Sequence, residues 1–280
     1  MKNTFSVLLL FILSAILRAQ DYGDTLVLFE KKQVVYLLGD SINVRKTPGT
    51  NGAVVTRLPI GTRVTILEKS REASRINNIL MPWYLVEFNG KQQGYIWGGK
   101  LALNSFRSNK NPDIAFHFGI DKKGNEEGAY AEFQIRVEKD HKELQRLNFK
   151  AFGTEYKRHV CSNISNKGLS GVDDILQVDG YGESCGDNAG AMIFFWTGTE
   201  LIYVDQLYDY VDGGYFGRQF FVYPSDMEGE KETVIKKEQV GEIVFEEGQT
   251  YATWDSHNVV YEKNESTRLR WDGKKLQPKK

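Results

Sequence analysis

Several residue types are scarce in this chain of 280 residues, and each scarcity excludes a class of site. Only two cysteines and four histidines are present. No Cys-x-x-Cys or His-x-x-x-His pair occurs among them, so nothing supports a zinc site. No glycine-rich phosphate-binding motif lies between an expected strand and an expected helix. We therefore expect no zinc site and no cofactor, and we assign no metal ligand.

Neither sign of charge dominates, because 36 basic residues stand against 37 acidic ones and charged residues make up 26% of the chain. This balance is typical of a globular protein. The charge is unevenly distributed: residues 36–103 carry a net charge of +5 and residues 112–280 a net charge of −9. The acidic balance of the larger segment argues against nucleic acid as a partner.

The first nineteen residues have the pattern of a secretory signal peptide. Lys2 precedes an apolar run at residues 5–17, and Ala19 supplies a small residue where cleavage is expected. This run is too short to cross a bilayer, which needs roughly 20 apolar residues. We expect residues 1–19 to be removed, the mature chain to lack a membrane span, and the protein to be soluble in the periplasm or outside the cell.

Short strand signals alternate with turn signals between residues 36 and 103. Apolar and polar residues alternate at residues 62–67, as in a half-buried strand. Asn89-Gly90 favours a two-residue hairpin turn between two further strand signals. About five strands without helical periodicity predict a small barrel, because closure removes exposed sheet edges.

The strand and turn residues of this segment follow a fixed order: Ile42-Asn43-Val44-Arg45 and Pro48; Leu58, Gly61, Val64 and Leu67; Trp83-Tyr84 and Val86; Asn89-Gly90-Lys91; and Gly94-Tyr95-Ile96 up to Leu101. In this order the segment, residues 36–103, resembles the bacterial SH3 (SH3b) domain. Two features depart from the family pattern, a polar insertion at residues 70–81 and Trp97. The resemblance implies an SH3-like barrel that binds cell-wall peptides, glycan-linked peptides or a protein partner, and it implies no catalysis.

Trp97 is the main candidate for ligand binding in this segment. Gly98 and Gly99 follow it and offer little to bury it, and amphipathic aromatic residues are common at recognition surfaces. Packing of Trp97 on the second domain is the alternative, whereas Trp83 is expected in the core. The remaining candidates supply an aromatic ring or a positive charge: Tyr84, Tyr95, Arg45 and Arg63.

The rest of the chain is also predicted to be β-structure. Residues 104–111 are polar and are interpreted as a linker. Residues 112–280 contain about nine strand signals, and the alternation is clearest at residues 130–138. Only residues 138–147 are a weak helical candidate. The fold class is therefore all-β, with a larger antiparallel domain that is a sandwich, a barrel or a propeller-like sheet.

One pattern, Trp-x-Gly-x-x-Leu, occurs twice in this larger domain. It begins at Trp196 and again at Trp271. A glycine two residues after a strand-ending tryptophan is placed for a tight turn into the next strand. We expect two similar hairpins whose tryptophans pack in the core.

The two cysteines, Cys161 and Cys185, are expected to form a disulfide, since an exported protein meets oxidising conditions. The alternative is a thiolate nucleophile acting with His159 or His257. No helical pattern follows either cysteine, which argues against this alternative.

A glycine-rich stretch at residues 180–190 contains further candidates. Ser184 lies in a Gly-x-Ser-x-Gly string, but the strand and helix that a nucleophile elbow needs are missing around it. Five acidic residues in and before this stretch supply oxygen atoms of the kind that calcium prefers, without a regular calcium-loop spacing: Asp173, Asp174, Asp179, Glu183 and Asp187. We leave calcium binding open and assign no catalytic residue.

The sequence thus predicts an exported binding protein of the bacterial cell envelope that recognises cell-wall peptide, glycan or an envelope protein without covalent chemistry. The alternative is a peptidoglycan hydrolase with its site in the C-terminal domain, using Asp187 and Glu183 or a free Cys185. The ligand, the oligomeric state and the role of residues 112–280 are left open.

Overall fold

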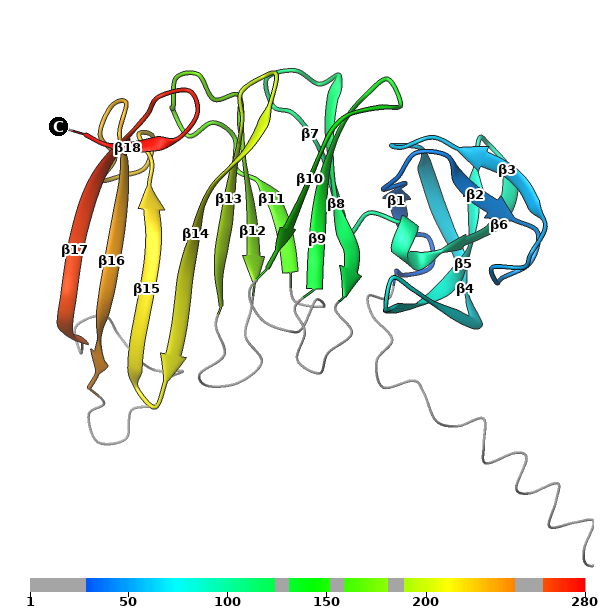
Figure 1. Cartoon of the computed structure of the whole chain (residues 1–280), viewed down its shortest axis with the longest axis horizontal. Helices are drawn as coiled ribbons and strands as arrows, with labels where there is room; N and C mark the ends of the chain where they lie inside the picture. Colours follow the sequence, from blue (N-terminus) through cyan, green and yellow to red (C-terminus); the bar gives the residue numbers. More distant parts are fainter. Residues whose placement is uncertain (1–28, 124–130, 152–158, 181–188, 245–258, 280) are drawn as a thin grey trace, which may run out of the picture.

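The computed structural model describes residues 29–123, 131–151, 159–180, 189–244 and 259–279. Every regular element in these ranges is a β-strand, apart from the short 3-10 helix η1 (Gly98–Lys100). The strands form three antiparallel sheets of six, four and eight strands (Figure 1). The predicted all-β class is confirmed. Within the described part of the chain no helix is long and apolar enough to span a membrane, and the predicted signal peptide lies outside that part.

The six-stranded sheet forms the N-terminal domain, and its strand order is β1-β4-β5-β6-β2-β3. Val64 and Ile66 are both buried in its core, as their alternation predicts. Asn89 and Gly90, both with positive φ, form the predicted hairpin turn. The strands are β1 (Val34–Tyr36), β2 (Ile42–Arg45), β3 (Val54–Leu58), β4 (Arg63–Ile76), β5 (Ile79–Phe88) and β6 (Gln92–Trp97).

The polar insertion at residues 70–81 lengthens the hairpin formed by β4 and β5 into an arm that contacts the C-terminal region. Asn77 and Asn78, with φ of 52° and 61°, form its turn. Asn77 Nδ2 donates a hydrogen bond to the backbone oxygen of Asp121 at 3.3 Å, and the backbone N–H of Lys123 donates to the oxygen of Asn77 at 3.1 Å. The departure from the family pattern therefore attaches one domain to the other.

The four-stranded sheet has the order β10-β9-β8-β7. Its strands are β7 (Asn104–Arg107), β8 (Ile114–Lys123), β9 (Ala131–Lys139) and β10 (Lys142–Lys150). Two predictions are wrong here. Half of the predicted linker is β7, because its backbone pairs with β8. The helical candidate at residues 138–147 is a hairpin, because Asp140 and His141, with φ of 51° and 60°, turn β9 back into β10.

The eight-stranded sheet is a meander in which each strand pairs with the next (Figure 1). Its strands are β11 (His159–Asn163), β12 (Asp174–Gly180), β13 (Ala189–Trp196), β14 (Leu201–Asp212), β15 (Tyr215–Val222), β16 (Val234–Ile243), β17 (Val259–Trp271) and β18 (Leu276–Pro278).

The two C-terminal sheets pack against each other as a sandwich. Phe116 on β8 lies edge to face on Trp196, with ring centroids 5.7 Å apart, and Phe149 on β10 lies 4.8 Å from Phe194. At the edge, Gln145 Nε2 donates to the backbone oxygen of Leu201 at 2.9 Å and its Oε1 accepts from that residue's N–H at 2.7 Å. Aromatic rings therefore form the core, and the Gln145 amide links the edge strand β10 to the start of β14.

The opposite face of β12 and β13 has a second core. Ile175, Ile193 and Phe195 pack there with Trp271. Both repeated tryptophans are buried, and the glycines of their turns, Gly198 and Gly273, have φ of 92° and 97°. The two predicted hairpins and their core positions are confirmed.

The outer face of β8 and β9 is buried against the N-terminal domain. Alternation places Arg136 and Glu138 on a solvent face, yet they are only 7% and 3% exposed. His117 lies beside them. Its Nδ1 and Ser105 Oγ share a hydrogen bond of 2.9 Å, and its Nε2 lies 3.6 Å from Glu138 Oε2. The polar face is therefore a domain junction, which alternation along a single strand cannot reveal.

Candidate functional site

Two of the five candidate binding residues in the N-terminal domain are buried. Tyr84 is fully buried and its Oη accepts a hydrogen bond from the backbone N–H of Phe29 at 3.2 Å. Trp97 is 4% exposed and donates Nε1–H to the backbone oxygen of Ser74 at 2.9 Å. Burial raises the pKa of Tyr84, although the Phe29 hydrogen bond lowers it. Neither ring is on the surface, so the prediction that Trp97 is an exposed ligand platform is wrong.

The glycines after Trp97 explain why it is buried. A Cβ on Gly99 would lie 2.2 Å from the Trp97 ring, so the ring folds back over this glycine. Ser74, on the arm, accepts from Trp97 through its backbone oxygen and from Trp83 Nε1 through Oγ at 2.8 Å. The alternative reading, in which Trp97 packs towards the second domain, is the observed one, since it belongs to the core cluster shared with the C-terminal sheets.

Two other candidates come together on the surface of the N-terminal domain. Arg45 on β2 pairs in register with Tyr95 on β6 and, on its other side, with Val54 on β3. Tyr95 and Arg45 are half-buried, and Val54 is 44% exposed. Arg45 also donates to the backbone oxygen of Gly52 at 2.6 Å. We call Tyr95, Arg45, Val54 and Val55 the barrel strip. Arg63 is exposed on β4, with β5 and β6 between it and β2.

The predicted disulfide joins Cys161, which the structure describes, to Cys185, which lies outside the described residues. Cys161 is a free, buried thiol that packs in the core between the C-terminal sheets. Burial raises the pKa of this thiol, with a smaller contribution from the charge of Asp179, which disfavours the thiolate that a nucleophile needs. The structure contains no disulfide at Cys161. Cys185 lies outside the described residues, as do Glu183, Ser184, Asp187 and His257; His159 is buried with its ring 4.6 Å from that of Phe133.

The three described acidic residues considered for calcium, Asp173, Asp174 and Asp179, do not gather in one place. Asp174 is buried at the start of β12, where it accepts hydrogen bonds from Ser108 Oγ, from Asn109 N at 2.8 Å and from Asn163 Nδ2 at 3.0 Å. Asp173 forms an ion pair with Lys110. Asp179 lies five residues further along the strand, about 17 Å away at 3.4 Å per residue. No group of three or more potential metal ligands occurs in the described ranges.

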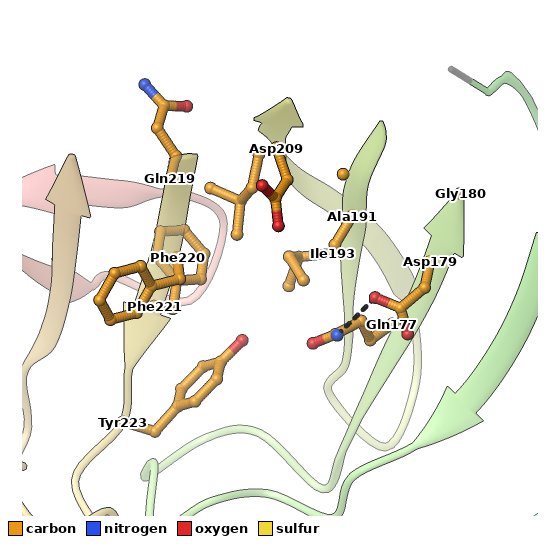
Figure 2. Close-up of a pocket in the computed structure, with 12 residues that line it drawn as sticks. Gln177, Asp179, Gly180, Ala191, Ile193, Asp209, Gln219, Phe220, Phe221 and Tyr223 are labelled. Atoms are coloured by element: carbon orange, nitrogen blue, oxygen red, sulfur yellow. Dashed lines mark hydrogen bonds between the residues drawn. The ribbon is translucent and has the colours of Figure 1, made fainter. Parts of the chain in front are cut away.

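Asp179 instead lines a cleft of about 330 Å³ on the eight-stranded sheet (Figure 2). The cleft forms where two neighbouring strands separate. Strands β14 and β15 pair only from Asp209 to Asp212, although β14 begins eight residues earlier. Buried apolar side chains of β13, β14 and β15 form its floor, and polar side chains line the rest of it.

Four polar side chains face this cleft; they come from two strands and from the residue that follows a third strand. Gln177 and Asp179 come from β12, Asp209 from β14, and Tyr223 follows β15 (Figure 2). Gln177 Nε2 donates to Asp179 Oδ1 at 2.7 Å. The Tyr223 hydroxyl is buried and points into the cleft, and it has no hydrogen-bond partner among the described residues. A buried hydroxyl without a partner is costly, so this group is available to a ligand.

The surroundings of the two carboxyls disfavour their charged forms. Burial raises the pKa of Asp179, and the hydrogen bond from Gln177 lowers it in part. Asp209 lies at the rim and is more exposed; the loss of hydration there raises its pKa, which the charge of Arg218 lowers in part. Burial, and next the charges of Asp226 and Asp205, raises the pKa of Tyr223. At neutral pH Tyr223 is therefore a neutral donor and acceptor.

Sequence reasoning identifies Asp179 in an acidic stretch but does not identify the cleft. Asp209 and Tyr223 lie 30 and 44 positions further along the chain than Asp179 and follow no motif. Strands β14 and β15 pair only from Asp209 onward, and the pairing of β13 with β14 has a register shift between Ile193 and Phe194. The cleft therefore depends on strand pairing that a sequence pattern does not specify.

Comparisons with known proteins assign one part of the chain. No curated protein and no solved structure matches the chain. Residues 40–102 match the family model of the bacterial SH3 domain. These residues span β2 to β6 and include Arg45 and Tyr95, in agreement with the resemblance found in the sequence. The N-terminal domain of this chain is a bacterial SH3 domain.

Proposed function

We propose that the protein is a binding protein of the bacterial cell envelope, in which the SH3 domain recognises a cell-wall peptide or glycan and the cleft adds a second contact. The match of residues 40–102 to the bacterial SH3 domain carries this proposal, because such domains commonly bind cell-wall components. The export predicted from residues 1–19 would place the protein beside this ligand.

The barrel strip supports binding at the SH3 domain. It combines an aromatic ring, a guanidinium group and two exposed apolar side chains, Val54 and Val55, which are 44% and 56% exposed. Strand β3, which carries both valines, is the last strand of its sheet. An edge strand with exposed apolar residues can pair with an extended peptide, whose main chain supplies the hydrogen bonds.

The proposed binding is non-covalent. The alternative, a hydrolase, depends on Glu183, Asp187 or Cys185, which all lie outside the described residues. The two readings predict different outcomes when purified protein is incubated with purified cell-wall sacculi. We expect the protein to sediment with the sacculi while no soluble glycan or peptide fragments are released. Release of fragments would contradict non-covalent binding, and absence of sedimentation would contradict the proposed function.

A further inference from the structure

We infer that the cleft on the eight-stranded sheet binds a primary ammonium group on a short aliphatic chain, as in the side chain of a diamino acid within a peptide. The inference goes beyond the proposed function by naming the ligand class of the second contact, and it rests on that function for the biological source of the peptide.

The carboxyl groups of the cleft favour a ligand that carries a positive charge. Asp179 has the Gln177 amide as its hydrogen-bond partner and forms no ion pair with a described residue. Arg218, the basic residue opposite Asp209, donates instead to Gln239 Oε1 at 2.8 Å and lies over the Phe220 ring at 5.4 Å. A carboxylate that is partly removed from water without a cation is unfavourable, and a bound ammonium group would relieve this cost.

The Tyr223 hydroxyl is the second, independent observation. It is 4% exposed, points into the cleft and has no hydrogen-bond partner in the described part of the chain (Figure 2). A tyrosine hydroxyl accepts from an ammonium N–H, or it donates to a peptide carbonyl beside it. A peptide with an amino side chain offers both groups, so it satisfies the hydroxyl in either arrangement.

The floor of the cleft selects an organic cation over a metal ion. Ile193, Leu207 and Phe221 are 1%, 4% and 9% exposed and line it from below. Calcium takes six to eight oxygen ligands, whereas the described residues hold no group of three potential metal ligands. The apolar floor suits the methylene groups of an amino side chain, and the volume of about 330 Å³ holds such a chain with its peptide unit.

Three small probes test this assignment by calorimetry or by NMR titration. Nα-acetyl-lysine methylamide carries the ammonium group, Nα,Nε-diacetyl-lysine methylamide has it neutralised, and Nα-acetyl-norleucine methylamide lacks it. We expect the first probe to bind at least tenfold more tightly than the other two. Equal binding of all three probes, or no saturable binding of the first, would overturn the inference.

Variants assign the binding to the cleft. Asp179→Asn removes the charge at constant shape, and Tyr223→Phe removes only the unpartnered hydroxyl, so neither is expected to unfold the sheet. Each should weaken binding of the lysine probe at least fivefold. Asp212→Asn is the matched control, because Asp212 is exposed on the same strand as Asp209 and does not line the cleft. Unchanged binding in Asp179→Asn would overturn the inference.

Sacculi whose free amines have been acetylated separate this inference from the proposed function. If the protein sediments with native sacculi and acetylation changes nothing, the ammonium site is wrong and envelope binding stands. If the lysine probe binds the cleft but the protein does not sediment with native sacculi, the ammonium site stands and the proposed function fails.

Discussion

Trp97 donates its indole N–H to the backbone oxygen of Ser74 at 2.9 Å, and this bond joins the end of the SH3 fold to the arm that contacts the C-terminal sheets. Trp83 bonds the side chain of the same serine. A tryptophan that the sequence presents as a binding residue therefore has a structural role at the domain junction.

Replacement of Trp97 should accordingly affect stability. Trp97→Ala removes a buried ring and should lower the free energy of unfolding by about 3–5 kcal/mol. Trp97→Phe keeps most of the packing and loses the hydrogen bond, for a loss of about 1 kcal/mol. Urea unfolding followed by fluorescence measures both, with Val55→Ala as a surface control. A Trp97→Ala protein of normal stability that fails to bind sacculi would contradict this account.

Gly61 should be required at the domain junction for two reasons: its positive φ and its lack of a side chain. Its φ is +69°, and a Cβ there would lie 2.8 Å from Glu138 Oε2 and 3.2 Å from His117 Nε2. Gly213 has a similar φ of +56° and nothing within 4 Å. We expect Gly213→Ala to cost about 1 kcal/mol of stability and Gly61→Ala at least about 2–3 kcal/mol. Equal losses in thermal or urea unfolding would show that Gly61 does not contact the second domain.

Glu138 should make the free energy of unfolding fall at acidic pH. Burial raises its pKa, but His117 and the backbone N–H of His141 lower it more, so its pKa in the folded protein is below the ordinary value. Its contribution is then complete above the unfolded pKa and lost as the pH falls through the folded pKa. Glu138→Gln should be less stable than wild type at pH 7, and the difference should shrink below pH 4. Glu72→Gln, on the exposed arm, is the control; a difference independent of pH would contradict the assignment.

Asp179 should behave in the opposite way. Its pKa is raised by burial, so the folded state binds the proton more tightly than the unfolded state does. The protein should therefore gain stability from this group as the pH falls, and lose that gain as the pH rises through the raised pKa. Asp179→Asn should be slightly more stable than wild type at pH 7, by less than about 1 kcal/mol because the group is half-exposed. A less stable variant would show that interactions in the folded protein already offset the cost of burying the Asp179 carboxylate.

The sequence specifies much of this fold through local signals. Alternation places Val64 and Ile66 in the SH3 core, and the turn glycines of the Trp-x-Gly-x-x-Leu pattern place Trp196 and Trp271 in the second domain. These features depend on neighbours within a few residues, which is why they can be predicted.

Features that depend on distant parts of the chain do not follow from sequence patterns. The polar face of β9, with Arg136 and Glu138, is buried only because another domain covers it. The composition of strand β7 indicates a linker, because its partner β8, and not its own composition, determines its structure. The cleft does not follow from the sequence for the same reason, since it depends on how far β14 pairs with β15.

The central claim is that the SH3 domain binds the cell wall through the barrel strip, and sedimentation with purified sacculi over a range of protein concentrations tests it most directly. The account predicts saturable binding by the wild-type protein, binding weakened at least tenfold in Val54→Asp, and unchanged binding in Val260→Asp, a matched change at a residue that is 59% exposed on the C-terminal sheet. Wild-type protein that stays in the supernatant, or equal binding by both variants, would contradict it.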